Sequence, residues 1–286
     1  MKRALCGSGF SLTLLLALIA GSAHAEPAKR IVSLAPHLTE LAFTAGAGDR
    51  IVATVEYSDH PDAARAIPRI GDAFRVDLER LIATRPDAVL VWETGNPAQI
   101  VERIRTLGLP MVAFQTQRLA DVATVLRAIG RLAGTSDVAE RAASDYERQI
   151  SALRELYRKR APLRVFIQVD DRPLYTVNGK QIISEIVELC GGRNVFADLN
   201  ELAPAIGIEA VIAANPQVIV STDDTVPDAA AAWSRWRHIE AVRTGNVYTL
   251  VADDIARATT RLTVAADAVC RTLDTARQRL AQAPPH

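Results

Sequence analysis

The chain has 286 residues, and its 33 lysines and arginines balance 33 aspartates and glutamates. A near-neutral chain lacks the basic surface with which proteins bind nucleic acid, so the composition argues against that class of partner. Hydrophobic residues make up 49% of the chain and aromatic residues 5%, which is typical of a folded α/β protein. A chain of this length has room for two lobes.

Residues 1–25 have the pattern of a secretory signal peptide. Lys2 and Arg3 precede an apolar run over residues 10–21, and Ala23 and Ala25 supply the small residues of an A-x-A site. We therefore expect export, with cleavage after Ala25. The alternative is an uncleaved anchor, but an apolar run of about 12 residues is too short to span a bilayer.

From residue 30 on, short apolar segments alternate with segments of helical periodicity. Asp77 is expected to cap one of these helices, and Pro86 to end it. This alternation predicts a mostly parallel sheet flanked by helices, which we assign to an N-terminal lobe of residues 26–134. The expected strands are 30–34, 51–57, 87–92 and 111–115, and the expected helices are 37–48, 78–85, 97–108 and 119–134.

The alternation stops between residues 137 and 160, where the sequence predicts one long helix. Asp137 and Glu140 indicate its start. An apolar stripe at helical spacing runs along it and comprises Val138, Ala142, Tyr146, Ile150, Leu153 and Tyr157. The alternative is an ordinary surface helix, but its place between two similar halves favours a rigid connector, residues 135–161.

Strands and helices alternate again in residues 162–286, which we assign to a C-terminal lobe. The expected strands are 163–169, 217–221 and 246–251, and the expected helices are 181–192, 209–216, 229–239 and 259–280. The predicted fold is therefore α/β, with two similar lobes, each a mostly parallel sheet flanked by helices, joined by one long backbone helix. Ligands of open α/β sheets bind beyond the carboxyl ends of the strands, which predicts a ligand cleft between the lobes.

One pattern occurs twice. "DLERLIATRPDAVLVW" (77–92) and "GIEAVIAANPQVIVST" (207–222) both place a glutamate, Glu79 or Glu209, seven positions before a proline. Both predict a short helix, a proline and then a buried strand. The helix dipole favours a glutamate in a first turn for purely structural reasons, so the spacing alone leaves a functional role open.

Two cysteines follow the expected signal peptide, Cys190 and Cys270. In an exported chain such a pair predicts a disulfide. Closing a loop of 80 residues stabilises the fold by roughly 4–5 kcal/mol. Neither cysteine has metal-ligand spacing or a nearby histidine, so no metal site is expected.

Five segments are distributed over most of the chain between residues 30 and 270: "RIVSLAPHLTELAFTAG", "VEYSDHP", "DLERLIATRPDAVLVW", "VELCGGRNVF" and "DDIARATTR". Together they resemble the helical-backbone substrate-binding proteins of ABC importers, the group that carries cobalamin, haem and ferric siderophores. The similarity is greatest to the cobalamin-carrying members. It implies a monomeric periplasmic receptor with no catalytic residues and no permanently bound cofactor, which passes a corrinoid to a permease dimer in the inner membrane.

The resemblance also implies roles for individual residues. Tyr57, Trp92, Asp253 and Arg257 match positions that line the ligand cleft of the cobalamin-carrying members, and Phe74 lies beside another such position. Taken alone, these residues have structural alternatives. Tyr57 suits a partly buried strand end, Trp92 suits core packing, and Asp253 with Arg257 suits a solvated ion pair.

Glu79 and Glu209 match the two rim carboxylates that dock onto permease arginines in this family. Cys190 and Cys270 match the positions of the family's disulfide, in agreement with the inference from the cysteines themselves. The dimeric permease would offer two equivalent basic pockets, which suits two equivalent carboxylates.

The sequence departs from the cobalamin-carrying members at several cleft positions. Cleft tryptophans are replaced by Ala73 and Ala203, and two aromatic residues by Asp254 and Ile255. Aromatic faces supply much of the burial for a flat ring system, so a related corrinoid remains an alternative to cobalamin.

Two other ligand classes and an enzyme are the alternative functions for this chain. Haem needs an axial tyrosine or histidine, for which Tyr57, His37 and His60 are candidates. A ferric siderophore needs cationic groups, for which Arg69, Arg75 and Arg257 are candidates. An exported enzyme is disfavoured because the chain beyond residue 25 has no G-x-S-x-G, H-E-x-x-H or phosphate-loop motif.

Overall fold

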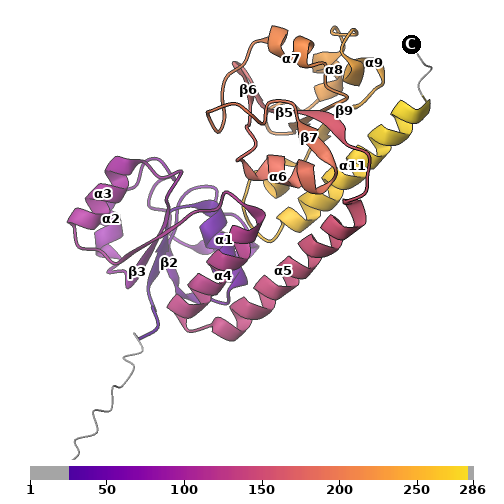
Figure 1. The fold of residues 1–286 in the computed structure, drawn as a ribbon. Helices are drawn as coiled ribbons and strands as arrows, with labels where there is room; N and C mark the ends of the chain where they lie inside the picture. Colours follow the sequence, from indigo (N-terminus) through magenta and orange to yellow (C-terminus); the bar gives the residue numbers. More distant parts are fainter. Residues whose placement is uncertain (1–25, 283–286) are drawn as a thin grey trace, which may run out of the picture.

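The structure, a computed structural model, describes residues 26–282. The predicted signal peptide and its cleavage point lie outside these residues. Figure 1 shows two lobes, one built mainly from the first half of the chain and one from the second, with a long helix running from one to the other. The predicted α/β fold class is therefore confirmed.

The first lobe is built on a four-stranded parallel sheet in the order β2-β1-β3-β4. Its strands are β1 (Ile31–Ser33), β2 (Ile51–Ala53), β3 (Ala88–Trp92) and β4 (Met111–Phe114). The strand expected over residues 51–57 is shorter than predicted. Residues 54–56 leave the sheet and bond instead to residues 68–71, with Thr54 N–H donating to Pro68 O at 3.0 Å and Glu56 N–H to Gly71 O at 2.8 Å. The left-handed backbone of Tyr57 (φ 64°) then ends the extended segment.

Helices cover both faces of this sheet. Helices α1 (Pro36–Thr44) and α4 (Leu119–Ala133) pack on one face, and α2 (Leu78–Ala83) and α3 (Ala98–Thr106) contribute to the other. Two 3₁₀ turns, η1 (Gly48–Arg50) and η2 (Asp62–Ala66), complete the lobe. Asp77 caps α2 as predicted, because its carboxylate accepts the backbone N–H groups of Glu79 and Arg80.

The second lobe repeats this strand order. Strands β7 (Gly192–Asn194), β8 (Val218–Thr222) and β9 (Val247–Leu250) lie parallel to β5 (Leu163–Asp171), and β6 (Leu174–Thr176) adds an antiparallel strand where β5 ends. The order β7-β5-β8-β9 therefore corresponds to β2-β1-β3-β4. Sequence patterns missed β6 and β7, which have only three residues each.

Short helices surround the second sheet. They are α6 (Ile182–Leu189), α7 (Ile208–Ala214), α8 (Ala229–Trp233), α9 (Glu240–Arg243) and α10 (Ala252–Ile255). The helix expected over residues 229–239 is wrong beyond Trp233. Two tight turns follow, with Trp236 N–H donating to Trp233 O and Ile239 N–H to Trp236 O. These turns let both Trp233 and Ile239 enter the same core cluster.

Helix α5 (Ser136–Tyr157) connects the lobes, and α11 (Leu262–Gln282) packs beside it (Figure 1). Tyr146, Ile150 and Tyr157 are buried as predicted, but Val138 is exposed. The predicted start at Asp137 is also wrong, because the helix begins one residue earlier and its N-cap makes no side-chain hydrogen bond. One hydrophobic cluster runs from α1 and α4 through α5 to α6 and α11. The two lobes therefore share a core.

The repeated motif ends a helix in the same way in both lobes. Arg85 and Asn215, each directly before a proline, have left-handed backbones (φ 46° and φ 41°). This conformation ends a helix, and the proline prevents it from continuing. Directly after the prolines, Asp87 N–H donates to Arg30 O and Gln217 N–H donates to Arg164 O, both at 2.8 Å. The repeat in the sequence is thus a repeat in backbone structure.

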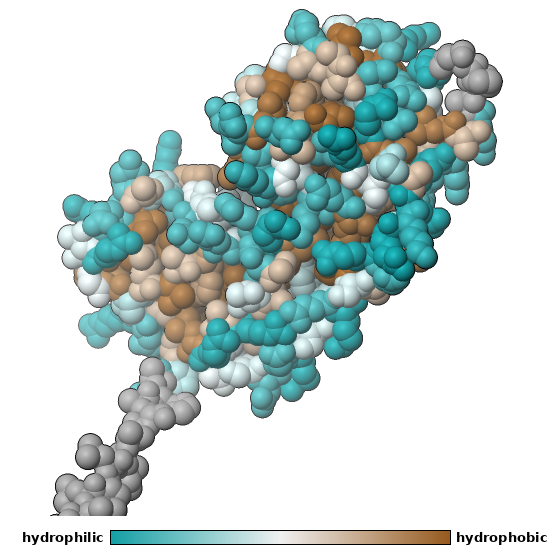
Figure 2. Space-filling model, in the orientation of Figure 1, coloured by the Kyte–Doolittle hydropathy of each residue, from teal (hydrophilic) through white to brown (hydrophobic). Residues whose placement is uncertain are grey.

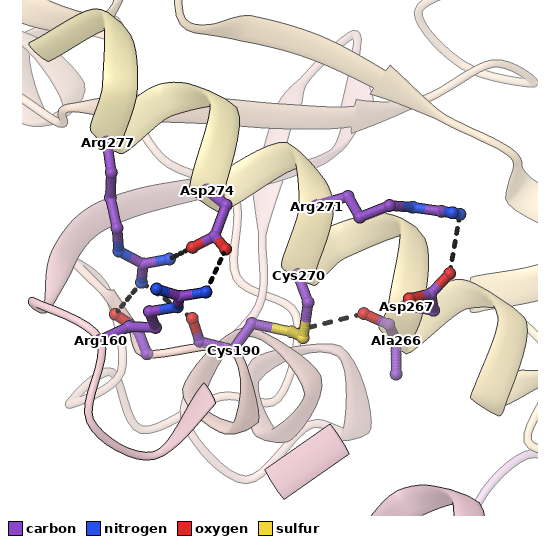
Figure 3. The surroundings of a disulfide bond; sticks show 9 residues. Arg160, Cys190, Ala266, Asp267, Cys270, Arg271, Asp274 and Arg277 are labelled. Atoms are coloured by element: carbon purple, nitrogen blue, oxygen red, sulfur yellow. Dashed lines mark hydrogen bonds and ion pairs between the residues drawn. A yellow bond between two sulfur atoms is a disulfide. The ribbon is translucent and has the colours of Figure 1, made fainter. Parts of the chain in front are cut away.

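The predicted disulfide is present and ties α6 to α11 (Figure 3). Cys190 and Cys270 are both fully buried. Beside the bond, Arg277 donates to the carbonyl oxygens of Cys190 and Gly191 at 2.8 and 3.0 Å, and pairs with Asp274 at 2.7 Å. A cation therefore satisfies the carbonyl groups left free at the end of α6.

Candidate functional site

The carboxyl ends of the two sheets meet at the boundary between the lobes. Asp59, in the segment after β2, pairs with Arg257, which follows β9 and α10, at 2.7 Å. Figure 2 shows that the outline of the molecule is indented between the lobes, on the side away from α5. Ligands of open α/β sheets bind at such a boundary, so the side chains that reach it are the candidate ligand-binding residues.

Tyr57 projects from the segment after β2 and is 75% exposed, which rules out the partly buried alternative. Its left-handed backbone is unfavourable for a bulky residue and persists only where the surroundings fix it. The neighbouring Ser58 does so. Its hydroxyl joins a buried network with the hydroxyls of Thr54 and Thr39, at 2.9 and 3.3 Å.

Phe74 lies at the tip of a tight turn, residues 71–76, and is 63% exposed. The Asp72 carboxylate accepts the backbone N–H groups of Phe74 and Arg75 at 2.7 and 2.8 Å. Gly71 has φ 111°, and a Cβ there would meet the carbonyl oxygen of Arg75 at 2.0 Å. Only glycine therefore permits this turn.

Trp92, the last residue of β3, is half-buried. Its indole packs edge-to-face on the imidazole of His37, with 5.1 Å between ring centroids and 83° between planes. A Cβ on Gly95 would lie 1.9 Å from the indole, so that residue must be glycine for the ring to take this position. Trp92 therefore packs on the core, which is the structural alternative, and still keeps part of its surface exposed, as a cleft residue requires.

His37 is 6% exposed, and its Nε2 shares a hydrogen bond with the Thr116 hydroxyl at 3.3 Å. Burial, with a smaller contribution from the positive charge of Arg257, lowers the pKa of His37 from 6.5 to about 4. At neutral pH it is therefore an uncharged packing partner of Trp92. His60, the other histidine near the boundary, is exposed.

Arg257 forms ion pairs with both Asp253 and Asp59, at 3.0 and 2.7 Å. Burial acts to raise the pKa of Asp59, but the hydrogen bond and charge of Arg257 outweigh it and hold that pKa below its ordinary value. The ion pair that is the structural alternative for Asp253 and Arg257 is thus present, and it extends across the boundary to the first lobe.

A second group of ion pairs beside this one was not predicted. Arg261 donates to both oxygens of Glu40 at 3.0 Å, and to Asp254 at 3.0 Å. The Glu40 side chain is only 4% exposed, and it comes from α1 of the first lobe. Arg257 and Arg261 therefore each tie the second lobe to an acidic residue of the first.

Apolar side chains at the carboxyl edge of the second sheet were also missed. Val251 directly follows β9 and is exposed, as are Leu199 and Leu202 in the segment after β7. Val251 is the last residue of the strand predicted over 246–251, and this place at the carboxyl end of a strand is the signal that could have identified it. The two leucines follow a strand that the sequence did not reveal.

Glu79 and Glu209 occupy matching places, each in the first turn of a short helix, α2 or α7. Both are exposed, and within residues 26–282 neither forms an ion pair. Two free carboxylates on equivalent helices of the two lobes are thus available to a partner.

Across residues 26–282, no cluster of histidine, cysteine, aspartate or glutamate has a geometry that could hold a metal ion. In the same part of the chain, no helix combines the length and the apolar character needed to cross a membrane.

The two-lobe fold with ligand-accessible strand ends is that of a periplasmic binding protein, and the chain belongs to this family. The family's sequence profile, described as "Periplasmic binding protein", matches residues 31–253. Proteins of this family are binding proteins, which bears out the expectation that the chain is not an enzyme.

Individual relatives within the family show which kinds of member this chain is similar to. The chain is 35% identical over 254 residues to a protein of Vibrio campbellii named "Vitamin B12-binding protein", covering 88% of this chain and 92% of that one. The crystal structure of the periplasmic vitamin B12-binding protein BtuF of Vibrio cholerae matches with a TM-score of 0.82 and 35% identity, over 88% of this chain and 98% of that one. The haem-binding protein RhuT of Roseiflexus, at 23% identity and a TM-score of 0.76 over 87% and 99% of the two chains, shares the fold.

Proposed function

We propose that this protein captures a corrinoid, cobalamin or one of its precursors, between its lobes in the periplasm and delivers it to an ABC importer. The observation that carries the proposal is the 35% identity, over 88% of the chain, to a relative named for vitamin B12 binding. The corrinoid is a transported ligand in this proposal and not a resident cofactor.

The side chains at the boundary suit such a ligand. In this proposal the exposed Tyr57 and Phe74 and the half-buried Trp92 form an aromatic wall of the first lobe, and a large flat ring system gains much of its burial from such faces. Val251 offers apolar surface from the second lobe. Phe74 and Val251 thereby supply part of the apolar area that Ala73 and Ala203 do not.

Polar contacts would come from Asp253 and Arg257. Corrinoid side chains are amides, which both accept and donate hydrogen bonds. Asp253 offers a largely exposed carboxylate, and Arg257 lies beside it at 3.0 Å. The pair can therefore bind an amide oxygen and an amide N–H side by side.

Delivery would use the two rim carboxylates. Glu79 and Glu209 are exposed on equivalent helices, and a dimeric permease offers two equivalent basic pockets. In this proposal the protein is a monomer whose leader is cleaved after Ala25. The lobes, residues 26–134 and 162–286, close only slightly because their connector, residues 135–161, lies within a shared core.

Haem is the second candidate, favoured by the exposed phenol of Tyr57, which could serve as an axial ligand. His37 is not available for that role because it is buried against Trp92. A ferric siderophore is disfavoured. Two carboxylates already offset the charge of Arg257, although its N–H groups can still donate to a neutral amide, and Arg69 donates to three backbone carbonyl groups. Of the three candidate cations this leaves Arg75, which is exposed.

Calorimetric titration of the mature protein with cyanocobalamin, cobinamide and haemin tests the proposal. Binding of either corrinoid, with haemin weaker or absent, is the expected result. Binding of haemin alone, with the absorption spectrum of a tyrosine-ligated iron, would overturn the corrinoid assignment and leave the fold and the docking carboxylates untouched.

A further inference from the structure

Asn96 joins three separate segments beneath the aromatic wall. It lies four residues after Trp92 and is 5% exposed. Its Oδ1 accepts the backbone N–H of Trp92 at 2.8 Å, and its Nδ2 donates to Leu34 O at 3.0 Å and to Ala73 O at 2.7 Å. Three of the four hydrogen bonds available to an asparagine amide are therefore made inside the protein.

The three segments differ in what holds them. Leu34 is fixed to the sheet, since its N–H donates to Leu90 O at 2.9 Å. The turn that carries Phe74 is held by internal bonds to Asp72. Within residues 26–282, the bond from Asn96 is the only hydrogen bond that links residues 72–75 to the rest of the protein. At the base of the turn, Gly71 O accepts the Glu56 N–H at 2.8 Å. Asn96 is thus the side chain that anchors the tip of the turn, which carries Phe74, to the strand that ends in Trp92.

We propose that Asn96 is a positioning residue of the cleft, which holds Trp92 and the Phe74 turn in one arrangement as a preformed wall for the ligand. The inference rests on the proposed function, because that function makes these two aromatic residues a binding surface. Preorganisation matters here because side chains that become ordered only when the ligand binds lose conformational entropy, and this loss lowers the affinity.

The variant Asn96→Asp isolates this role. It keeps the size of the side chain and the acceptor for the Trp92 N–H, but it replaces the two-donor amide with a carboxylate that faces the carbonyl oxygens of Leu34 and Ala73. Losing these bonds should weaken cyanocobalamin binding by about tenfold. Asn96→Ser removes the same bridge without adding charge, and it serves if the aspartate variant does not fold.

Asn246→Asp is a matched control. Asn246 is also fully buried, and its Nδ2 donates to the Thr244 hydroxyl at 3.0 Å. It lies just before β9, at the amino edge of the second sheet and away from the cleft. The control and the Asn96 variants should both lower the melting temperature, but only the Asn96 variants should lower the affinity.

The three tryptophans provide a readout that does not depend on ligand. In protein labelled with fluorotryptophan, Asn96→Asp should shift or broaden the ¹⁹F resonance of Trp92 and leave those of Trp233 and Trp236, in the second lobe, unchanged.

Wild-type affinity in both Asn96 variants, or an equal loss in Asn246→Asp, would overturn the inference. Failure of the wild-type protein to bind cyanocobalamin would instead defeat the proposed function. The Trp92 resonance would still decide whether Asn96 positions that side chain, and an unmoved resonance would show that it does not.

Discussion

Arg261 is where the boundary between the lobes should be most sensitive to mutation. Its guanidinium binds both carboxylate oxygens of Glu40 at 3.0 Å, and within residues 26–282 no other side chain hydrogen-bonds to that carboxylate. Because the Glu40 side chain is only 4% exposed, Arg261→Ala would leave a buried charge without a partner. Such a loss costs about 3–5 kcal/mol of unfolding free energy, and we expect the upper part of this range.

The reverse substitution should be milder. Glu40→Ala leaves Arg261 paired with Asp254 at 3.0 Å, so about 3 kcal/mol is expected. Replacing both members of the pair, Glu40→Leu with Arg261→Met, removes both charges and should cost less than either single change. The ranking of the three variants by loss of unfolding free energy therefore tests whether that loss comes from leaving a buried charge unpaired or only from losing the contact.

Urea unfolding of the oxidised protein at pH 7, with linear extrapolation to water, measures these differences. The control is Arg65→Ala, which removes an ion pair with an almost fully exposed Asp62 and should cost less than about 1 kcal/mol. If Arg261→Ala costs no more than Arg65→Ala, the pair does not hold the lobes together and the reasoning is refuted.

Three further predictions concern the site itself. Tyr57→Gly should raise the free energy of unfolding by about 1 kcal/mol, because glycine relieves the left-handed backbone. Both Tyr57→Gly and Tyr57→Ala should weaken cyanocobalamin binding, but the alanine variant should not gain stability. Unchanged affinity in calorimetric titration would remove Tyr57 from the site. Because the pKa of His37 is about 4 when folded and about 6.5 when unfolded, the unfolded chain takes up a proton first as pH falls. Stability should therefore drop by up to about 3 kcal/mol between pH 6.5 and pH 4, and a denaturant series on His37→Leu should lack that slope. Glu79→Lys combined with Glu209→Lys should abolish docking to the reconstituted permease while ligand affinity is kept; intact docking would contradict the proposed role of the repeat.

Local signals were enough to predict most of the fold. Prolines and glycines mark where helices end, and uninterrupted apolar runs mark buried parallel strands, so each strand of the first sheet was found. The repeated motif also predicted matching helices and strands in the two lobes. Both Arg85 and Asn215 show why it worked, because a helix end followed by proline is encoded within a few residues.

The contacts that shape the site are not local, and the sequence did not reveal them. Asn96 bonds to a carbonyl group 62 positions away, and Arg261 pairs with a glutamate 221 positions away. Nothing in the segment around Tyr57 indicates a left-handed backbone, because the Ser58 hydroxyl that holds it belongs to a buried network that reaches Thr39, 19 positions away. The sequence could therefore identify site residues that match family positions, but it could not identify the residues that fix those side chains in place.

The disulfide makes the stability of one lobe depend on the compartment in which the chain finds itself. Cys190 and Cys270 both belong to the second lobe, Cys190 directly after α6 and Cys270 on α11. In a reducing compartment the chain lacks this link, so its second half folds with a smaller stability margin. Once an oxidising compartment closes the link, the same half gains about 4.5 kcal/mol, and its folding becomes hard to reverse.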